Sequence, residues 1–343
     1  MAASVPLTTL NNGHTMPVIG LGTSFATRHS IRDTMLTALE LGYRHFDTAL
    51  LYQNETEIGR VLAEALQRGQ VTREELFITT KLWCTYNHPQ RVTDGLRRSL
   101  DNLGLDYIDL FLIHMPACFQ YVDEWTWTPR DATGTIRYDT ADHAATWKEL
   151  EKAVNAGLVR SIGLSAVNCR QVQYILDHCT ITPANVQVEN HAYLMQGDLF
   201  RLCSRHAIHL TAFSPLGSPD RCRADLPRLL DDPVVIRIAH RHAKTPGQVL
   251  LRFLLQRGRL VIPRSTSRQH LHDNLDVFDF ALAPAEMQAL AGLDRKGHVR
   301  YYPFDQINDS LDAPYAPLTG ISNVSVTPDR PSPCQTDYDG TAL

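Results

Sequence analysis

The sequence predicts an α/β fold, a (β/α)8 TIM barrel that begins with an N-terminal β-hairpin and carries long loops at its rim. Eight short apolar runs alternate with amphipathic segments, the order expected of parallel strands joined by crossover helices. Several runs end in a charged or titratable residue, which is typical of a barrel whose functional groups line one rim. The predicted strands are Val18–Gly22, His45–Ala49, Leu76–Lys81, Ile108–His114, Ser161–Ser165, Asn185–Glu189, His209–Ser214 and Leu260–Arg264.

The segments between these runs have the apolar spacing of helices. The predicted helices are Ser30–Leu41, Glu55–Arg68, Pro89–Leu103, His143–Ala156, Arg170–His178, Leu199–His206 and Pro233–Leu255. The alternative fold is a doubly wound open sheet, whose first strand is normally followed by a glycine-rich phosphate turn. Only Gly20-Leu21-Gly22-Thr23 occurs there, with no third glycine, so the sequence favours the closed barrel.

Three segments depart from simple alternation. Leu7–Val18 carries Asn12-Gly13 between two extended pieces, which predicts a hairpin that covers the N-terminal end of the barrel. Pro116–Asp142 is a long insertion after the fourth strand, and long loops of this kind are usually functional. We expect residues 1–316 to form one barrel domain and residues 317–343, rich in Pro, Ser, Thr and Asp, to form a flexible tail.

Composition narrows the class of protein. The chain has 343 residues, 43% hydrophobic and 20% charged, with a net charge of −4. These values suit a globular enzyme, and no basic stripe indicates a nucleic-acid partner. No apolar run approaches the roughly 20 residues that span a bilayer, and the N-terminus lacks the features of a signal peptide. Seven dispersed cysteines without a Cys-x-x-Cys pair indicate reduced thiols, so we expect a cytoplasmic protein with no membrane partner.

Four residues indicate carbonyl chemistry. Asp47, Lys81 and His114 each close a short β-branched or aromatic run, and Tyr52 follows Asp47 by five residues. A free phenol has a pKa of about 10, and a nearby ammonium lowers it. A phenol, an ammonium, a carboxylate and an imidazole at one rim therefore suit proton donation to a carbonyl. Singly, Asp47 could cap a helix, Tyr52 could be a buried aromatic and Lys81 a solvated strand end, but the four together favour catalysis.

Five motifs occur in order along the chain. They are Gly42–Ala49 with Tyr52, Asn54-Glu55 and Gly59; Thr80–Trp83; Leu103–Leu110 leading to His114; Ser214–Arg221; and Ile262–Ser265 continuing to Asp273-Asn274. Over about residues 5–305, this series resembles the aldo-keto reductase family, with its lysine strand, histidine strand, cofactor-clamping loop and adenine-side segment. The resemblance implies the barrel fold, a monomer, and NADPH bound without a Rossmann unit.

The resemblance also assigns roles to the four rim residues. Tyr52 would supply the proton to the carbonyl oxygen of a small-molecule substrate, and Lys81 would lower the pKa of its phenol. Asp47 would hold the ammonium and keep it charged. His114 would donate a hydrogen bond to the developing negative charge and select the orientation of the carbonyl.

For the cofactor, the resemblance implies that Ser165 and Gln187 bind the nicotinamide carboxamide and that Phe213 stacks on its ring. The sequence departs from the family pattern at two of these positions. Ala166 replaces the usual Asn, which removes one carboxamide partner, and Phe213 replaces the usual Tyr. The expected cofactor-binding residues are Thr23, Ser165, Gln187, Phe213, Ser214, Leu216, Ser218, Arg264, Ser265, Ser267, His270, Asp273 and Asn274.

Cofactor preference depends on the 2′-phosphate residues, which the resemblance places at Arg264, Ser265 and Ser267. The usual lysine is Arg264 here, which keeps the charge and can bind phosphate bidentately. The usual adenine-side arginine aligns with His270, whose imidazole is mostly neutral at pH 7. We expect NADPH to be preferred over NADH by less than is usual, with NADH bound more weakly.

The substrate pocket departs most from the family. Ser24 stands where an aromatic residue is usual and Met115 where a Trp is common, so two ring walls are missing. Two interpretations stay open: a pocket widened for bulky carbonyls, or one refilled by other loop aromatics. The expected substrate-binding residues are Ser24, Phe25, Met115, Phe119, Trp125, Trp127 and Tyr301.

Three classes of function compete. The first is NADPH-dependent reduction of an aldehyde or ketone, which the four rim residues support. The second is a non-catalytic NADPH-binding protein on the same barrel, which the pocket departures motivate. The third, a metal-dependent hydrolase, needs ligands at several strand ends, and only His114 and Asp47 qualify. The His-x-His pairs at 240 and 270 point apart on helices, so we expect no metal site.

Overall fold

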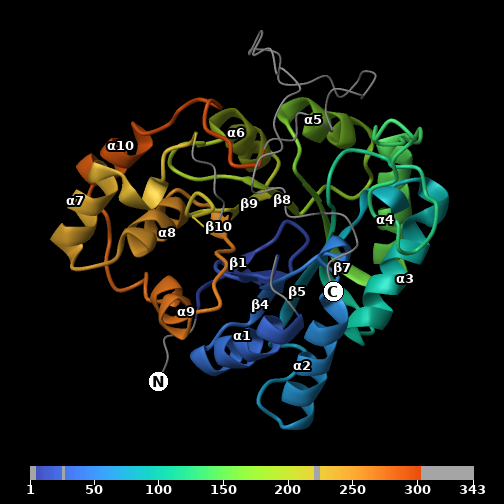
Figure 1. Cartoon of the computed structure of the whole chain (residues 1–343), viewed down its shortest axis with the longest axis horizontal. Coiled ribbons are helices and arrows are strands. Elements are labelled where there is room, and N and C mark those ends of the chain that lie inside the picture. The colour runs from blue at the N-terminus through green and yellow to red at the C-terminus, as the bar shows by residue number, and fades with distance from the viewer. Residues whose placement is uncertain (1–4, 25–27, 220–224, 303–343) are drawn as a thin grey trace.

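The computed structural model describes residues 5–24, 28–219 and 225–302. Within them, eight parallel strands form one sheet in the order β10-β9-β8-β7-β6-β5-β4-β3, so each strand pairs with its sequence neighbour (Figure 1). The strands are β3 Leu21–Gly22, β4 His45–Asp47, β5 Phe77–Leu82, β6 Ile108–Ile113, β7 Val159–Ser165, β8 Asn185–Glu189, β9 His209–Phe213 and β10 Leu260–Val261. All eight predicted strands are present, several of them shorter than expected.

The sheet closes on itself between its first and last strands. Ile19 forms a parallel bridge with Val261, the Gly20 N–H donates to the Val261 carbonyl at 2.9 Å, and the Val261 N–H donates to Val18 at 3.0 Å. These bonds leave neither edge open, which is what a barrel requires. The predicted (β/α)8 barrel is confirmed.

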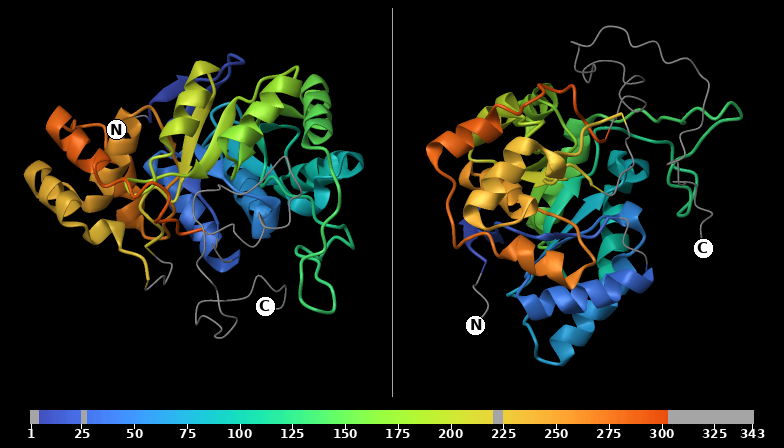
Figure 2. Two further views of the ribbon diagram at one scale, coloured as in Figure 1. Left: turned by 90° about the horizontal axis from the view of Figure 1, so that it is seen from above. Right: turned by 60° about the vertical axis from the view of Figure 1, so that its left-hand side comes forward.

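Helices surround the strands on the outside of the barrel (Figure 2). The α-helices are α1 Arg28–Leu41, α2 Glu55–Gln67, α3 Val92–Leu103, α4 His143–Asn155, α5 Cys169–His178, α6 Gly197–Arg205, α7 Pro233–His242, α8 Pro246–Gln256, α9 Arg268–Leu275 and α10 Pro284–Ala291. The short 3₁₀ helices are η1 Leu50–Tyr52, η2 Cys84–Tyr86, η3 Pro89–Arg91 and η4 Leu229–Asp231.

The prediction of one helix over Pro233–Leu255 was wrong. The structure ends α7 at His242, the next residue, Ala243, caps it with a left-handed φ of 50°, and α8 begins after Thr245. The Thr245 hydroxyl accepts from the Gln248 N–H at 3.2 Å and the Gln248 side chain accepts from the Thr245 N–H at 2.9 Å, a capping box with Pro246 in the first turn. The sequence Thr-Pro-x-Gln at this point is a signal for the start of a helix. It was missed because the apolar pattern continues across it.

The predicted hairpin is confirmed. Strands β1 Leu7–Thr9 and β2 Thr15–Pro17 pair antiparallel, with Leu7 opposite Pro17, and Gly13 takes a φ of +89° in the turn. Its buried residues pack beneath the barrel in a cluster made by Leu10, Met16, Phe77, Leu110, Leu112, Ala184 and Leu260. The left view of Figure 2 shows this dark blue hairpin at the end of the strands opposite the green loop of residues 116–142.

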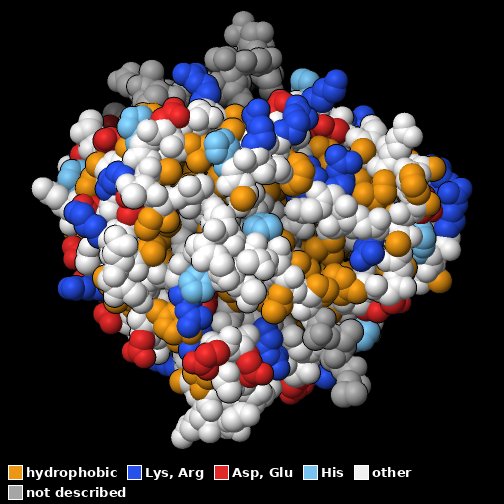
Figure 3. Space-filling view, turned by 180° about the vertical axis from the view of Figure 1, so that it is seen from behind, with side chains coloured by type: hydrophobic (Ala, Val, Ile, Leu, Met, Phe, Trp, Pro, Cys, Tyr) orange, Lys and Arg blue, Asp and Glu red, His pale blue; other side chains and the backbone are white. Residues whose placement is uncertain are grey.

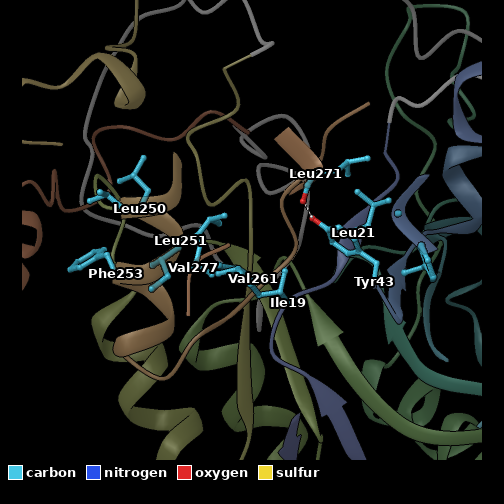
Figure 4. Packing of buried hydrophobic residues seen from close by; sticks show 14 of the residues in the cluster. Ile19, Leu21, Tyr43, Leu250, Leu251, Phe253, Val261, Leu271 and Val277 are labelled. Atoms are coloured by element: carbon cyan, nitrogen blue, oxygen red, sulfur yellow. Dashed lines mark hydrogen bonds between the residues drawn. The ribbon is translucent and has the colours of Figure 1, made fainter. Parts of the chain in front are cut away.

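A second layer of packing joins the barrel to its outer helices. Ile19 and Leu21 belong to one fully buried cluster with Leu251 of α8, Leu271 of α9 and Val277 (Figure 4). The Tyr43 hydroxyl donates to the Leu271 carbonyl of α9 at 3.1 Å, which satisfies a polar atom inside this apolar layer. Each buried Leu or Ile contributes about 1.5–3 kcal/mol to stability.

The surface seen in Figure 3, from behind the view of Figure 1, mixes acidic and basic side chains with small hydrophobic patches. Across the part of the chain that the structure describes, none of the helices has the length and apolar character needed to cross a membrane.

Gly20 is required because a histidine ring occupies the place of its side chain. A Cβ at Gly20 would lie 2.3 Å from Nδ1 of His45, whose side chain is buried and whose Nε2 bonds Thr79 Oγ1 at 3.0 Å. Burial lowers the pKa of His45 to about 3, so the ring is neutral at physiological pH. The ring thus packs as an apolar group with one polar contact.

We predict that Gly20→Ala lowers the free energy of unfolding by about 1–3 kcal/mol, because the added methyl group would overlap the buried His45 imidazole. Urea denaturation measures this. Gly247→Ala in α8 is the matched control, since its Cβ would meet nothing closer than 3.8 Å. Equal stability of the Gly20 variant and the wild type would contradict this account of the glycine.

Candidate active site

The structure brings the four predicted catalytic residues to the carboxyl ends of neighbouring strands. Asp47 is the last residue of β4 and pairs in register with Thr79 of β5. Lys81 lies near the end of β5, and His114 directly follows β6. Tyr52 ends the short helix η1, which turns the chain back over the rim.

A buried ion pair forms the floor of this site. Lys81 Nζ donates to Asp47 Oδ1 at 2.5 Å and to the Thr48 carbonyl at 2.8 Å, with 1% of the lysine side chain exposed. The other carboxylate oxygen, Asp47 Oδ2, accepts from Gln187 Nε2 at 2.6 Å. Both charges are therefore held by fixed partners from three strands.

Burial shifts the ionisation of these groups toward their neutral forms. It raises the pKa of Asp47 and lowers the pKa of Lys81, while the attraction between the two charges opposes both shifts. Burial, followed by the positive charge of Lys81, holds the pKa of His114 well below its usual value. His114 is therefore a neutral imidazole at neutral pH.

Tyr52 faces both the ammonium and the imidazole. Lys81 Nζ lies 5.3 Å from the centroid of the Tyr52 ring. The Tyr52 and His114 rings meet edge to face, with centroids 5.7 Å apart and planes at 83°. Tyr52 is partly exposed, so a ligand at the rim could reach its ring.

Two groups that the sequence did not single out complete the site. Trp83, two residues after Lys81, sets its ring edge to face against His114 with centroids 5.2 Å apart. Asn54 joins two loops, since its Oδ1 accepts from Thr48 Oγ1 at 2.8 Å and its Nδ2 donates to the Thr23 carbonyl at 2.9 Å. Asn54 follows Tyr52 by two residues inside the first motif, and this position could have identified it from the sequence.

The predicted carboxamide residues lie side by side. Ser165, the last residue of β7, is the register partner of Gln187 in the middle of β8. Next to them, Ala166 takes a left-handed φ of 53°, a conformation that Asn adopts more readily than Ala. Phe213 ends β9 half-buried, and its ring meets Tyr302 edge to face at 5.4 Å.

The loop after β9 has an irregular backbone. Ser214, Gly217 and Ser218 have φ values of 51°, 74° and 46°, and Ser218 Oγ donates to Ser214 Oγ at 2.8 Å. The N–H groups of Leu216 and Ser218 bond no other residue of the described chain. Such loops present backbone donors to anions. The loop motif continues to Arg221, which lies outside the described residues.

The predicted 2′-phosphate residues gather at the start of α9. Ser265 Oγ accepts from the Ser267 N–H at 3.1 Å, and Ser267 caps the helix by accepting from the His270 N–H. His270 is exposed in the first turn. Arg264 lies beside the end of β3, since a Cβ added at Gly22 would be 3.9 Å from the Cβ of Arg264. Further along, Asp273 is half-buried and Asn274 is buried.

The predicted substrate residues are spread over several environments. Ser24 is half-buried at the rim, Met115 follows His114 and is 5% exposed, and Phe25 lies outside the described residues. The exposed fractions of the remaining four side chains are Phe119 1%, Trp127 8%, Trp125 74% and Tyr301 3%. Phe119 packs edge to face on Trp83, whereas Tyr301 packs on His191 and bonds the Pro227 carbonyl, nearer the loop after β9.

Comparison with known proteins agrees with this architecture. The Aldo/keto reductase family profile matches residues 18–295. Aldo-keto reductase family 1 member A1 of Mus musculus is 44% identical over 83% of this chain and 88% of its own length, and the Homo sapiens protein is 44% identical over 86% and 90%. The structure of the aldose reductase from Schistosoma japonicum superposes with a TM-score of 0.83 at 41% identity, covering 91% of this chain and 98% of that one.

The fold and these comparisons together define an NAD(P)H-dependent oxidoreductase, of a family that acts on small-molecule carbonyl substrates. The chain belongs to the aldo/keto reductase family.

We predict that Asp47→Asn destabilises the fold by about 3–5 kcal/mol at pH 7, because it leaves the Lys81 ammonium buried without its counter-charge. In this variant the pKa of Lys81 falls further below its unfolded value, so the unfolded chain binds more protons and stability rises with pH. Chemical denaturation at pH 7 and pH 9 measures both effects.

The double variant Asp47→Asn/Lys81→Met serves as the control. Removing both charges restores part of the stability and flattens the pH dependence. A double variant as unstable and as pH-sensitive as the single one would show that the ion pair is not the cause.

Proposed function

We propose that this protein reduces the carbonyl of an aldehyde or ketone to an alcohol, with NADPH as the preferred reductant and Tyr52 as the proton donor. The observation that carries the proposal is the arrangement of Tyr52 between a buried ammonium and a neutral imidazole at one rim of the barrel. NADPH, when bound, supplies the hydride. The residues of this chain donate the proton and orient the substrate.

Tyr52 donates its hydroxyl proton to the carbonyl oxygen of the substrate. The Lys81 ammonium, 5.3 Å from the ring centroid, stabilises the phenolate that remains. Asp47 fixes the ammonium by the 2.5 Å contact, and Gln187 in turn fixes Asp47. The proton donor is thus supported by side chains that are already in place before the substrate arrives.

His114 orients the substrate. Because it is neutral, it donates a hydrogen bond to the carbonyl oxygen through one ring nitrogen without bringing a second positive charge near Lys81. Trp83, whose ring contacts His114, forms one wall for the substrate. The half-buried Ser24, small where a ring is usual, leaves room for a bulky carbonyl on its side of the rim.

The residues present fit a nicotinamide dinucleotide. Ser165 and Gln187 are adjacent buried polar side chains, so they suit a carboxamide. Phe213 offers a half-buried aromatic face for stacking. Leu216 and Ser218 offer backbone donors for the diphosphate.

NADPH is favoured over NADH by the residues around α9. Arg264, Ser265 and the N-terminus of the helix suit a 2′-phosphate, since all present cations or hydrogen-bond donors. Asp273 and Asn274, one to two turns along the helix, would hold the adenine. His270 stands where the family's usual arginine would bring a permanent charge, so the preference for NADPH is moderate.

Tyr52→Phe tests the proton donor. We expect kcat/KM for carbonyl reduction to fall by about 10²–10⁴, because the acid is lost, while the Kd for NADPH changes by less than about twofold. NADPH absorbance with a panel from small aldehydes to polycyclic ketones follows the reaction, and NADPH fluorescence follows binding.

Tyr86→Phe is the matched control, since Tyr86 is a buried rim tyrosine that accepts a hydrogen bond from Arg98. Full activity of the Tyr52 variant would remove it as the acid. Wild-type protein that binds NADPH but turns over no carbonyl in the panel would favour the non-catalytic binding protein.

His270→Arg tests the phosphate site. We expect NADPH to bind about fivefold more tightly, corresponding to ~1 kcal/mol for an exposed charge pair, with NADH nearly unchanged. His272→Arg adds the same charge to the same helix two positions away, on another face, and should leave the ratio of the two Kd values unchanged. An equal effect of His270→Arg on both cofactors would place His270 away from the phosphate.

A further inference from the structure

Glu189 is a buried carboxylate at the rim to which the catalytic mechanism assigns no role. It ends β8, its side chain is 1% exposed, and its Oε1 accepts from His191 Nε2 at 3.0 Å. The same carboxylate accepts from two consecutive backbone N–H groups, Tyr301 at 2.7 Å and Tyr302 at 3.1 Å. Among the described residues no lysine or arginine pairs with this carboxylate. Its hydrogen bonds go to His191 and to the backbone of the segment that carries the two tyrosines.

The Tyr302 side chain extends from this anchor to the nicotinamide end of the cofactor site. Its ring meets Phe213 edge to face, with centroids 5.4 Å apart and planes at 84°. Edge-to-face contacts of this kind fix the tilt of a ring. Phe213 lacks the hydroxyl of the usual tyrosine, so its orientation depends on packing alone.

The Tyr301 side chain extends from the same anchor to the diphosphate end. A Cβ on Gly217, in the loop after β9, would lie 3.1 Å from the Tyr301 ring and 3.0 Å from Leu229. The Tyr301 hydroxyl also donates to the carbonyl of Pro227, which follows that loop in the chain, at 2.6 Å. Tyr301 therefore supports the loop from behind, at the glycine where the backbone has a φ of +74°.

We propose that Glu189 is a positioning residue that sets the lifetime of the bound cofactor, by fastening Tyr301 and Tyr302 behind the two parts of the cofactor site. The inference rests on the proposed function, since it takes Phe213 and the loop of residues 214–219 to be the walls that hold NADPH. One carboxylate fixes two neighbouring residues, and each of these supports a different wall. Loosening the anchor therefore loosens both walls together.

Charge is essential to this anchor. Hydrogen bonds from N–H groups to a carboxylate are about twice as strong as neutral ones. In Glu189→Gln the side chain keeps one acceptor oxygen, and its NH₂ group faces an N–H donor in place of the other. At least one of the two tyrosine N–H groups then loses its partner, while the volume of the side chain is unchanged.

The experiment compares wild type with Glu189→Gln. We expect the dissociation rate and the Kd of NADPH to rise about tenfold, the loss typical of one charge-assisted hydrogen bond. The single-turnover rate of carbonyl reduction at saturating NADPH should change by less than about twofold, because the proton donor is untouched. Stopped-flow fluorescence measures release, and rapid-quench analysis of product measures turnover.

Glu286→Gln is the matched control, a largely buried glutamate of α10 that binds His242 far from the cofactor site. Tyr301→Phe, which loses the bond to Pro227, and Tyr302→Leu, which loses the ring against Phe213, should each raise the dissociation rate by a smaller factor. These two variants decide the question if Glu189→Gln does not fold.

The outcomes separate a positioning role from a structural one. If Glu189→Gln lowers the melting temperature as Glu286→Gln does but leaves NADPH release unchanged, the proposal is overturned, and so it is if both tyrosine variants release NADPH at the wild-type rate. If the single-turnover rate falls with the release rate unchanged, Glu189 acts on chemistry and not on cofactor lifetime. Wild-type protein that binds neither NADPH nor NADH would instead overturn the proposed function.

Discussion

The contact between Lys81 and Asp47 is the constraint on which the rest of the site depends. Both groups are buried, and taking an ion out of water costs several kcal/mol, so the pair is tolerable only when each remaining donor and acceptor is satisfied. Thr48 and Gln187 supply those partners. The charge pair thus ties β4, β5 and β8 together inside the barrel, and the position of the phenol above it follows from the same arrangement.

The long loop of residues 116–142 is connected to this centre by a chain of side chains. Arg98 of α3 lies over the Trp127 ring at 5.1 Å, which holds the loop against the outside of the barrel. The Trp127 carbonyl accepts from Trp83 Nε1 at 2.7 Å, and the Trp83 ring contacts His114. The loop therefore helps to position the His114 imidazole through Trp83, in addition to any direct contact with a substrate.

The strands and the meeting of Asp47, Tyr52, Lys81 and His114 at one rim could be predicted because their signals are local. Each strand is a short apolar run, and a titratable group at its carboxyl end points to the rim whatever lies elsewhere in the chain. The break between α7 and α8 was missed because a continuous apolar pattern hid the capping box at Thr245. The surroundings of Tyr301 could not be predicted, because they depend on contacts with Glu189 and Gly217, about 112 and 84 positions away in sequence.

The N-terminal hairpin, described above only as a cover for the barrel, also bears on how the chain folds. Asn12 donates to the Arg160 carbonyl, Asn11 to the Pro183 carbonyl, and His209 bonds the Thr9 carbonyl. The hairpin precedes all three partners in the chain, so its contact with His209 can form only after 200 further residues have been made, and barrel closure waits longer still, for Val261. Because such distant contacts form slowly, the apolar face of the hairpin is exposed throughout synthesis, when chaperones have most access to it.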